Sequence, residues 1–307
     1  MPTRTAVTEA GGAPVTVLTV VLALLAALGN AAASVLQRRG TTQVDGGGAA
    51  VARWWSWATR LLRRRVWLWG AALLAVSGLC QAAALAAGPL AVVQPVMTTE
   101  LLFTMVIGSA VFRRRPDVRT WWAFVAMAAG LGAFMALLSP TGGGSTVPGS
   151  RWLWSGVLLA VLMVVLTVVA WRLPPAPAAA VLGTATAIGF AGTAALVKDA
   201  LGRLPDGGLG ALATTWQAYA AVVVGLGSFL LLQLTLRAGP LVASQPAMTL
   251  GDAFLSMLLG RVLFGEELTL GVRLVPELLA LALLIAGTVQ LARSPLLTST
   301  DGKERTW

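Results

Sequence analysis

An all-α membrane protein is the fold that the sequence predicts: a polytopic bundle of about nine transmembrane helices, built as two inverted-topology repeats plus one linking helix. Three observations predict it. Hydrophobic residues make up 57% of the 307 residues and charged residues 11%, which is more apolar surface than a soluble domain of this length buries. The apolar residues form runs long enough to cross a bilayer core of about 30 Å. One eleven-residue stretch occurs twice.

The repeated stretch begins with Gly-Pro-Leu in both copies. Residues 88–98 are GPLAVVQPVMT and residues 239–249 are GPLVASQPAMT, so seven of the eleven positions are identical. The identities include both prolines, the glutamine and the threonine, which an apolar segment does not acquire merely by being hydrophobic. This self-similarity indicates an internal duplication.

Windows of apolar residues predict the positions of nine spans. They cover residues 14–36, 67–87, 89–112, 120–138, 152–171, 178–197, 211–236, 240–264 and 272–292. The first run is too long for the core of a signal peptide, so we keep it as a retained span. Gly88-Pro89 and Gly239-Pro240 each join two adjacent spans, with the glycine past one helix end and the proline at the start of the next.

The spans divide the chain into five regions. Residues 1–13 form an N-terminal tail, 14–138 the first repeat, 139–177 a loop with the linking span, 178–292 the second repeat and 293–307 a disordered tail. Within the first repeat, residues 51–66 mix tryptophans with arginines. This mixture predicts an amphipathic helix lying in the cytoplasmic interface of the membrane.

The orientation follows from the positive charges. Sixteen of the 22 Lys and Arg residues fall on the side that holds the segment between spans one and two. The positive-inside rule therefore places that side in the cytoplasm, with the N-terminus outside and the C-terminus inside. Nine alternating crossings make spans three and eight antiparallel, so the repeats that contain them are inverted.

Composition also excludes several classes of function. The net charge of +10 does not indicate nucleic acid as a partner, because the arginines lie at the ends of apolar runs; the expected partner is the anionic surface of the lipid bilayer. One cysteine, Cys80, excludes an internal disulfide, and a chain without histidine is a poor candidate for a soft-metal site. We expect no cofactor. No nucleophile and base are paired by spacing, so we expect no enzymatic activity.

Polar residues form a stripe along the eighth span. Gln245, Thr249, Asp252 and Ser256 lie at spacings of four, seven and eleven, which places them on one helix face. A carboxylate at bilayer depth costs about 3 kcal/mol and by default marks a substrate path or proton site. The alternative is that Asp252 is neutral, or pairs with an arginine in the bundle, and serves packing alone.

The third span carries a related but less regular set. Gln94 and Thr98 share a face, while Glu100 is rotated by about 120° from Gln94 on an ideal helix. Glu100 and Asp252 match in depth but not in facing. The same two acids are the only candidates, and weak ones, for binding a metal.

Each copy also contains a proline inside its span. Pro95 and Pro246 lack an amide hydrogen, so we expect each to kink its helix and free a backbone carbonyl. Freed carbonyls of bent helices line the substrate sites of transporters. The alternative is a kink that serves packing alone.

We expect isolated glycine and amide residues inside other spans to hold helices together and not to bind a ligand. Asn30 and Gln217 are expected to form hydrogen bonds between helices, and Gly130 and Gly287 to permit close helix packing.

These residues resemble a known family. The Gly-Pro-Leu hairpin, the helix with a proline, the sequence Leu263-Phe264-Gly265-Glu266-Glu267-Leu268 and a last helix with Ala286-Gly287 are similar to the EamA-type repeat of the drug/metabolite transporter (DMT) superfamily. Nine spans with the N-terminus outside resemble its magnesium-transporter-like (NIPA-type) branch. The resemblance implies a bacterial-type inner (plasma) membrane carrier with two inverted bundles around a central cavity, and a structural role for Glu266. The first copy departs from the pattern, with Arg113-Arg114-Arg115 in place of Gly-Glu-Glu.

The sequence therefore predicts a secondary transporter that works by alternating access, with proton coupling as one option. Its substrate is a small metabolite, amino-acid-like or drug-like, that passes Asp252, Glu100, Gln94, Gln245, Thr98, Thr249 and Ser256. One alternative is a carrier of Mg²⁺ or another divalent cation, which prefers oxygen ligands. Another is a membrane scaffold that transports nothing, for which deleting residues 49–66 would matter more than Asp252→Asn. The oligomeric state is left open, with a homodimer as one option.

Overall fold

The computed structural model describes residues 9–42, 65–111, 118–137, 143–239, 241–266 and 274–292. Within these ranges the chain is helical apart from short connections, and no strand occurs. The all-α prediction is confirmed for this part of the chain. The helices are α1 (Glu9–Thr42), α3 (Arg65–Ala87), α4 (Leu90–Met97), α5 (Glu100–Val111), α6 (Val118–Leu137), α7 (Gly149–Ala170), α8 (Pro175–Leu201), α9 (Leu204–Thr214), α10 (Trp216–Ala238), α11 (Leu241–Leu259), the π-helix η1 (Gly260–Phe264) and α12 (Leu274–Ala292).

The multi-pass membrane character follows from the length and composition of these helices. Among the described residues, seven helical segments are long and apolar enough to cross a membrane. They are Val17–Leu36, Leu68–Ala87, Leu90–Val111, Gly149–Ala170, Pro175–Leu201, Trp216–Leu236 and Ser244–Phe264. Helices α6 and α12 occupy the ranges predicted for the fourth and ninth spans, and the count of nine stays a prediction.

Several boundaries differ from those predicted. Helix α1 begins at Glu9, inside the predicted tail 1–13, and the short helix α9 lies between α8 and α10, with its first seven residues outside any predicted span and its last four inside the predicted span 211–236. The predicted third span is divided into α4 and α5 by a turn at Thr98 and Thr99. Of the predicted interfacial helix 51–66, only Arg65 and Val66 are described, as the start of α3, and the predicted tail 293–307 lies outside the described residues.

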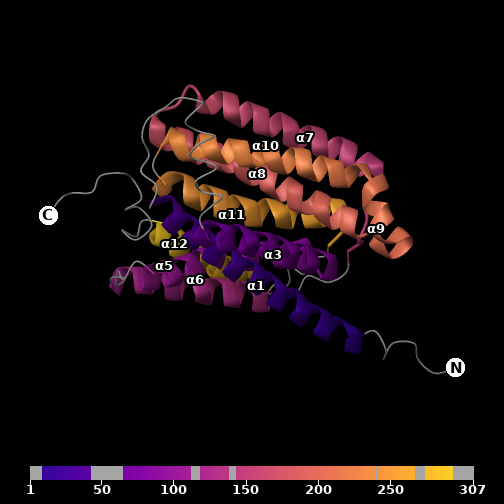
Figure 1. The fold of residues 1–307 in the computed structure, drawn as a ribbon, viewed down its shortest axis with the longest axis horizontal. Helices are drawn as coiled ribbons and strands as arrows, with labels where there is room; N and C mark the ends of the chain where they lie inside the picture. Colours follow the sequence, from indigo (N-terminus) through magenta and orange to yellow (C-terminus); the bar gives the residue numbers. More distant parts are fainter. Residues whose placement is uncertain are drawn as a thin grey trace.

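Helix α8 lies at the centre of the second half. It packs against α10, α11 and α7, and Figure 1 shows it running between α10 and α11. Most of its side chains are small and buried, which allows the neighbouring backbones to approach closely. The hydroxyls of Thr186 on α8 and Thr235 on α10 are 2.9 Å apart and form a hydrogen bond between the two helices.

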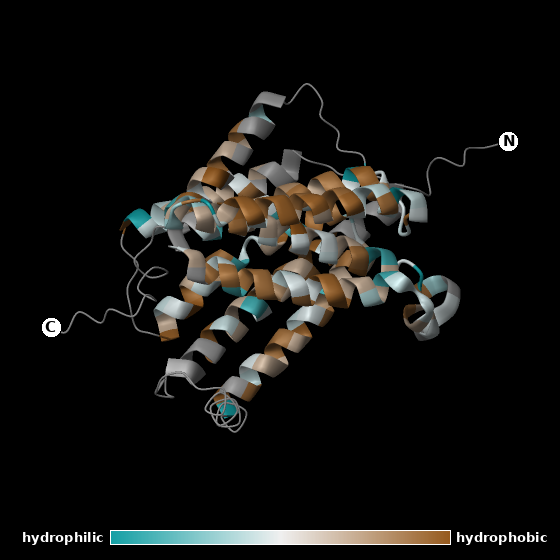
Figure 2. Ribbon diagram, turned by 90° about the horizontal axis from the view of Figure 1, so that it is seen from above, coloured by the Kyte–Doolittle hydropathy of each residue, from teal (hydrophilic) through white to brown (hydrophobic). Residues whose placement is uncertain are grey.

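Helix α7, the predicted linking span, lies at the edge of the bundle (Figure 1). Only 6% of its most apolar window is buried, so nearly its whole surface of valine and leucine is available to lipid. Figure 2 shows hydrophobic residues along much of the other long helices as well, and many large hydrophobic side chains of α1, α3 and α10 are exposed. An outer surface of this kind is expected of a protein whose solvent is the bilayer core.

One close contact occurs in both halves of the chain. A Cβ atom added at Gly29 of α1 would lie 2.9 Å from the Cβ of Ser77 on α3, and one added at Gly189 of α8 would lie 3.0 Å from the Cβ of Ser228 on α10. Ser77 and Ser228 are 151 positions apart, the same separation as the two Gly-Pro-Leu stretches. Helices α1 and α3 therefore meet through the same residue types as α8 and α10.

A second contact recurs at the Gly-Pro turns. A Cβ at Gly88 would lie 2.9 Å from the Cβ of Thr19 on α1, and one at Gly239 would lie 3.0 Å from the Cβ of Ala179 on α8. Thr19 and Ala179 are 160 positions apart, as are Gly29 and Gly189. Both turns need glycine because the neighbouring helix leaves no room for a side chain.

Candidate functional site

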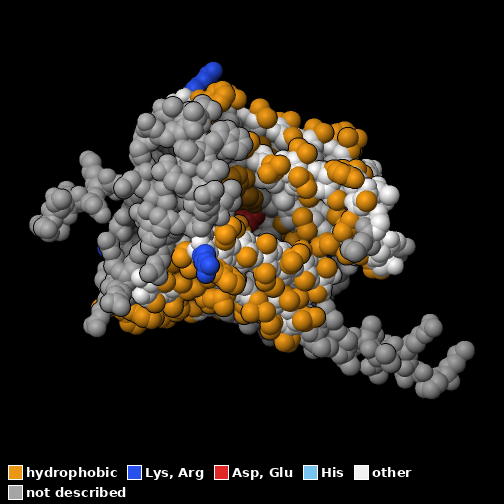
Figure 3. Space-filling model, viewed as in Figure 1, with side chains coloured by type: hydrophobic (Ala, Val, Ile, Leu, Met, Phe, Trp, Pro, Cys, Tyr) orange, Lys and Arg blue, Asp and Glu red, His pale blue; other side chains and the backbone are white. Residues whose placement is uncertain are grey.

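The face of the molecule seen in Figure 1 contains a hollow with acidic atoms at its floor, surrounded by hydrophobic side chains (Figure 3). Among the acidic side chains that the structure describes, Asp199 and Glu266 are buried, at 0% and 1% exposure, while Glu100 and Asp252 are partly exposed. The acidic atoms in the hollow therefore belong to Glu100, Asp252 or both. This hollow is the candidate functional site.

Glu100 is positioned by a chain of polar contacts from α1 and α3. Asn30 Nδ2 donates to Glu100 Oε2 at 3.3 Å. The hydroxyl of Ser77 lies 2.6 Å from Asn30 Oδ1 and 2.6 Å from the carbonyl oxygen of Ala26, and it can donate to either. The sequence indicated a hydrogen-bonding role between helices for Asn30, which this contact confirms. It did not indicate that the partner is an acid of the site, and Ser77 was missed.

The turn before Glu100 follows from the residues after Pro95. The amides of Thr98 and Thr99 donate to the carbonyls of Pro95 and Val96, three residues back, at 3.1 and 3.0 Å. Their hydroxyls donate to the same two carbonyls, both at 2.7 Å. These bonds replace the α-helical pattern with a tighter turn. Glu100 then begins α5 in a new register, so the facing expected from a continuous helix does not apply.

Asp252 lies on α11, which continues without interruption through Pro246. Its Oδ1 atom is buried and has no hydrogen-bond partner. Ser256, one helical turn later on the same face, is 0% exposed, and its hydroxyl also has no partner. Asp252 forms neither of the two ion pairs found among the described residues, which join Lys198 to Glu266 and Arg203 to Asp199. The expected alternative, an arginine paired with Asp252, is absent from this part of the chain.

The structure brings the two acids together. Glu100 and Asp252 lie within the range over which two charges influence each other. The sequence predicted that the two acids lie at equal depth but on different helix faces. The turn at Thr98 and Thr99 changes the facing of Glu100 and explains why that prediction differs from the structure. Glu100 and Asp252 follow the two copies of the repeated stretch, by two and three residues respectively.

The other residues of the predicted path are placed differently. Gln94 and Thr98 are packed among helices, at 3% and 4% exposure. Gln245 and Thr249 are partly exposed on α11, and the Thr249 hydroxyl donates to the Gln245 carbonyl at 3.0 Å. The kink expected at Pro246 stays a prediction, because α11 is a single helix through this residue.

A second buried charge cluster lies where the two halves meet, and we call it the Lys198–Glu266 junction. Lys198 Nζ is 2.6 Å from Glu266 Oε1, donates to the Gly88 carbonyl at 3.0 Å and lies 4.8 Å from the centre of the Phe264 ring. The backbone amides of Leu90 and Ala91 donate to the two oxygens of Glu266 at 2.7 and 3.0 Å. A carboxylate is stabilised there because the first amides of a helix lack partners and carry partial positive charge.

Local geometry brings Glu266 to this position. Gly265 ends η1 in the left-handed conformation, with φ of 68°, which glycine adopts without steric cost. The reversal directs Glu266 toward the start of α4. The beginning of α4 therefore lies beside the end of η1, and α4 also packs against α11, an arrangement that fits two helices running in opposite directions. The structural role expected for Glu266 is confirmed, whereas no sequence pattern indicated that Lys198 is buried, at 7% exposure.

Asp199, which sequence analysis also missed, connects three elements. It accepts hydrogen bonds from the amide of Val147 at 3.0 Å, from Trp152 Nε1 at 2.6 Å and from Gln217 Nε2 at 2.9 Å. Gln217 thus has the role between helices that was expected. This network has no spare acceptor directed at the hollow, so we assign it to the scaffold.

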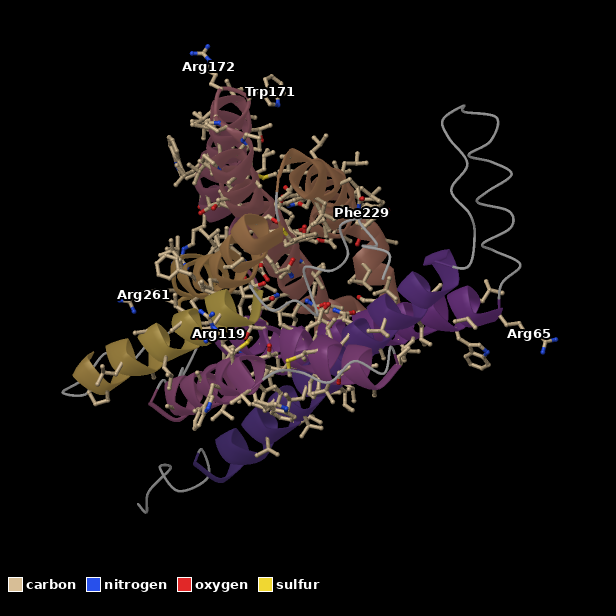
Figure 4. The ribbon with its side chains drawn as sticks, turned by 90° about the vertical axis from the view of Figure 1, so that its left-hand side faces the viewer. Arg65, Arg119, Trp171, Arg172, Phe229 and Arg261 are labelled. Carbon is tan, nitrogen blue, oxygen red and sulfur yellow. The ribbon has the colours of Figure 1, made fainter. Side chains whose placement is uncertain are left out.

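Two of the exposed arginines, Arg65 and Arg172, lie away from the site, whereas Figure 3 shows one basic side chain near the rim of the hollow. Figure 4 shows that Arg65 at the start of α3 and Arg172 after α7 project outward from the bundle. Both belong to the predicted cytoplasmic side. Neither contributes positive charge to the hollow.

Comparisons with known proteins give a relative but no function. No family model matches the chain, and no solved structure matches it. A protein of Corynebacterium glutamicum described as uncharacterized is 26% identical over 232 residues, which cover 75% of this chain and 80% of that protein. The functional argument therefore rests on the geometry of the site.

Proposed function

We propose that this protein is a secondary carrier of the drug/metabolite transporter type that moves a small solute across the plasma membrane by alternating access. The N-terminus lies outside and the C-terminus in the cytoplasm. The observation that carries the proposal is a hollow among apolar helices with acidic atoms of Glu100, Asp252 or both at its floor, the two acids coming one from each predicted repeat and lying within electrostatic range of each other.

The depth of the two acids supports this proposal. Glu100 is near the middle of the 22-residue segment Leu90–Val111, and Asp252 is near the middle of the 21-residue segment Ser244–Phe264. A charged side chain at this depth costs about 3 kcal/mol on insertion scales. Two that repel each other and have no ion pair weaken the fold further. Groups that are unfavourable for stability but placed together are typical of a binding site.

The inverted-repeat layout is part of the proposal. The contacts of Gly29 with Ser77 and of Gly88 with Thr19 recur in the second half as Gly189 with Ser228 and Gly239 with Ala179. The antiparallel course of α4 and α11 supports the inversion. Carriers built from inverted repeats bind their substrates near the bilayer midplane, between the repeats, which is where the two acids lie.

The test is solute-driven proton movement in vesicles. Purified protein is reconstituted into liposomes that contain a pH-sensitive dye, and amino acids, amines and Mg²⁺ are added outside one at a time, with uptake of each active solute measured directly. We expect at least one solute to be taken up, with Asp252→Asn and Glu100→Gln reducing uptake to the level of empty liposomes. Ser109→Ala is the control, because that hydroxyl bonds only within its own helix.

Two results contradict the proposal. One is uptake that both acid variants leave unchanged. The other is a cellular phenotype that survives Asp252→Asn but is lost on deletion of residues 49–66, which is the pattern expected of a scaffold.

A further inference from the structure

We propose that the hollow binds a primary or secondary ammonium group attached to an apolar body, with an N–H of the ligand donated to Asp252. The inference rests on the proposed function and specifies its substrate class. Three features of the hollow support this ligand: its charge, its hydrogen-bond acceptors and its hydrophobic walls.

The charge of the site calls for a cation. Glu100 and Asp252 repel each other, and the ion pairs among the described residues involve neither of them. Lys198, which lies deep in the bundle, is already held by Glu266 and the Gly88 carbonyl. Charges removed from water are stabilised by an opposite charge at close range. No residue in the part of the chain that the structure describes forms an ion pair with either acid, so an ammonium group on a ligand can be their partner.

The acceptors call for a ligand that donates hydrogen bonds. The Asp252 Oδ1 atom and the Ser256 hydroxyl are both buried and lie near each other; neither forms a hydrogen bond of standard geometry with another described residue, and Ser256 is 0% exposed. An unsatisfied polar group in a protein interior is unfavourable, and two such groups one helical turn apart are uncommon. An ammonium with N–H groups satisfies both positions. A quaternary ammonium carries the charge but no proton to donate.

The walls call for an apolar body. Figure 3 shows hydrophobic side chains around the acidic floor. On α5, Leu101 and Leu102 follow Glu100 and pack with Leu250 of α11, two residues before Asp252. A fully hydrated Mg²⁺ ion gains nothing from such walls, because it keeps most of its waters and needs oxygen ligands. An alkyl or aromatic amine gains binding free energy twice, because its ammonium group contacts the acidic floor and its apolar part contacts the hydrophobic walls.

The experiment measures binding to the full-length protein in lipid nanodiscs by calorimetry, with empty nanodiscs as the blank. The probes are benzylammonium, its neutral counterpart benzyl alcohol, benzyltrimethylammonium and Mg²⁺. We expect benzylammonium to bind, the quaternary ion to bind several-fold more weakly, and the alcohol to give no signal above the blank. Asp252→Asn is expected to weaken benzylammonium binding about tenfold or more, since a hydrogen bond to a charged group is lost.

Further variants separate binding from folding. Glu100→Gln removes the second charge and is expected to weaken binding several-fold. Ser256→Ala is expected to weaken it by a smaller factor without lowering the unfolding temperature of the ligand-free protein, because its hydroxyl has no partner to lose. Ser109→Ala is the control and is expected to bind as the unmodified protein does. Each variant is first checked for a single size-exclusion peak and unchanged helical circular dichroism.

The inference is overturned if benzylammonium does not bind the unmodified protein, if it binds Asp252→Asn equally well, or if benzyl alcohol binds as tightly. Mg²⁺ binding that depends on Asp252, without ammonium binding, overturns it as well. Uptake of a solute that is not an amine in the vesicle assay would leave the carrier function standing while removing this substrate class. Failure of the substrate class and failure of the proposed function are thus distinguishable.

Discussion

Lys198 and Glu266 are buried partners that depend on each other. Glu266 also accepts hydrogen bonds from two backbone amides at the start of α4, so three donors, including Lys198, stabilise its charge. Lys198 depends on Glu266 and on one carbonyl. Removing one member leaves an uncompensated charge in the interior, which costs far more than losing an exposed pair.

Lys198→Met is therefore expected to lower the free energy of unfolding by about 3–5 kcal/mol, as for other buried pairs that lose one partner. Unfolding of the purified protein by a rising mole fraction of SDS, followed by circular dichroism, measures the change. Arg203→Ala is the matched control: its side chain is 35% exposed in its pair with Asp199, and we expect a loss of at most about 1 kcal/mol. Equal losses for the two variants would contradict the buried role of Lys198.

At the residue scale, sequence analysis predicted single residues better than pairs. It selected Asp252 and Ser256 because a local helical pattern displays them, and it found Glu266 through a resemblance. It could not find the pairing of Lys198 with Glu266 or of Asn30 with Glu100, which join residues 68 and 70 positions apart. No local pattern encodes such contacts, since packing of distant helices decides them.

Helices α6 and α12 pack along each other, and Gly287 marks their closest approach. A Cβ atom added at Gly287 would fall against the backbone of Met127 on α6. Backbone atoms cannot move aside as a flexible side chain can. The close-packing role that the sequence predicted for Gly287 is thus confirmed.

Gly287→Ala is expected to destabilise the protein by about 1–3 kcal/mol, because overpacking forces the two helices apart. The matched control is Gly227→Ala on α10, where an added Cβ meets nothing within 4 Å. There we expect no loss and a gain of up to about 1 kcal/mol, from the higher helix propensity of alanine. Thermal unfolding in detergent compares the two variants, and a control that falls as far as Gly287→Ala would exclude the packing explanation.

At the scale of elements, sequence analysis predicted the helices well because each long apolar run must become a helix in a bilayer. It missed α9, which is too short and too rich in glycine to show a clear pattern. It also missed the turn at Thr98 and Thr99, because the hydroxyl bonds that support it become visible only when the backbone is already bent. That turn brings Glu100 toward Asp252, so the largest error about the site came from a local backbone feature.

The whole molecule is expected to lie with most of its arginines toward the cytoplasm. Reporter fusions test this arrangement. Green fluorescent protein fused to the C-terminus, or after Arg172, is expected to fluoresce, and alkaline phosphatase at the same points to stay inactive. After Arg203 the results are expected to reverse, because α8 separates Arg172 from Arg203. Phosphatase activity at the C-terminus would contradict the positive-inside argument and the topology based on it.

Whole-molecule organisation could be predicted from the sequence only as far as the duplication could be detected. The eleven-residue repeat indicated two related halves, but the separation of 160 positions between Thr19 and Ala179 becomes evident only from their contacts with Gly88 and Gly239. The resemblance implied a central cavity, but the residues that the hollow exposes could not be predicted, because the packing of distant helices decides them.

The Lys198–Glu266 junction can form only late in the synthesis of the chain. The amides at the start of α4 have no carboxylate partner until Glu266 is synthesised, 176 positions after Leu90. At roughly 5–20 residues per second, the ribosome needs on the order of 10–35 seconds to add these residues. During that interval the early helices stand in the bilayer without their cap, and Lys198 has no counter-ion when it arrives. A nascent chain stopped after Leu259 is therefore expected to be degraded by membrane proteases much faster than one stopped after residue 292. A pulse-chase measurement of the two truncated chains tests this expectation, and equal half-lives would show that the amino-terminal half matures without its later partner.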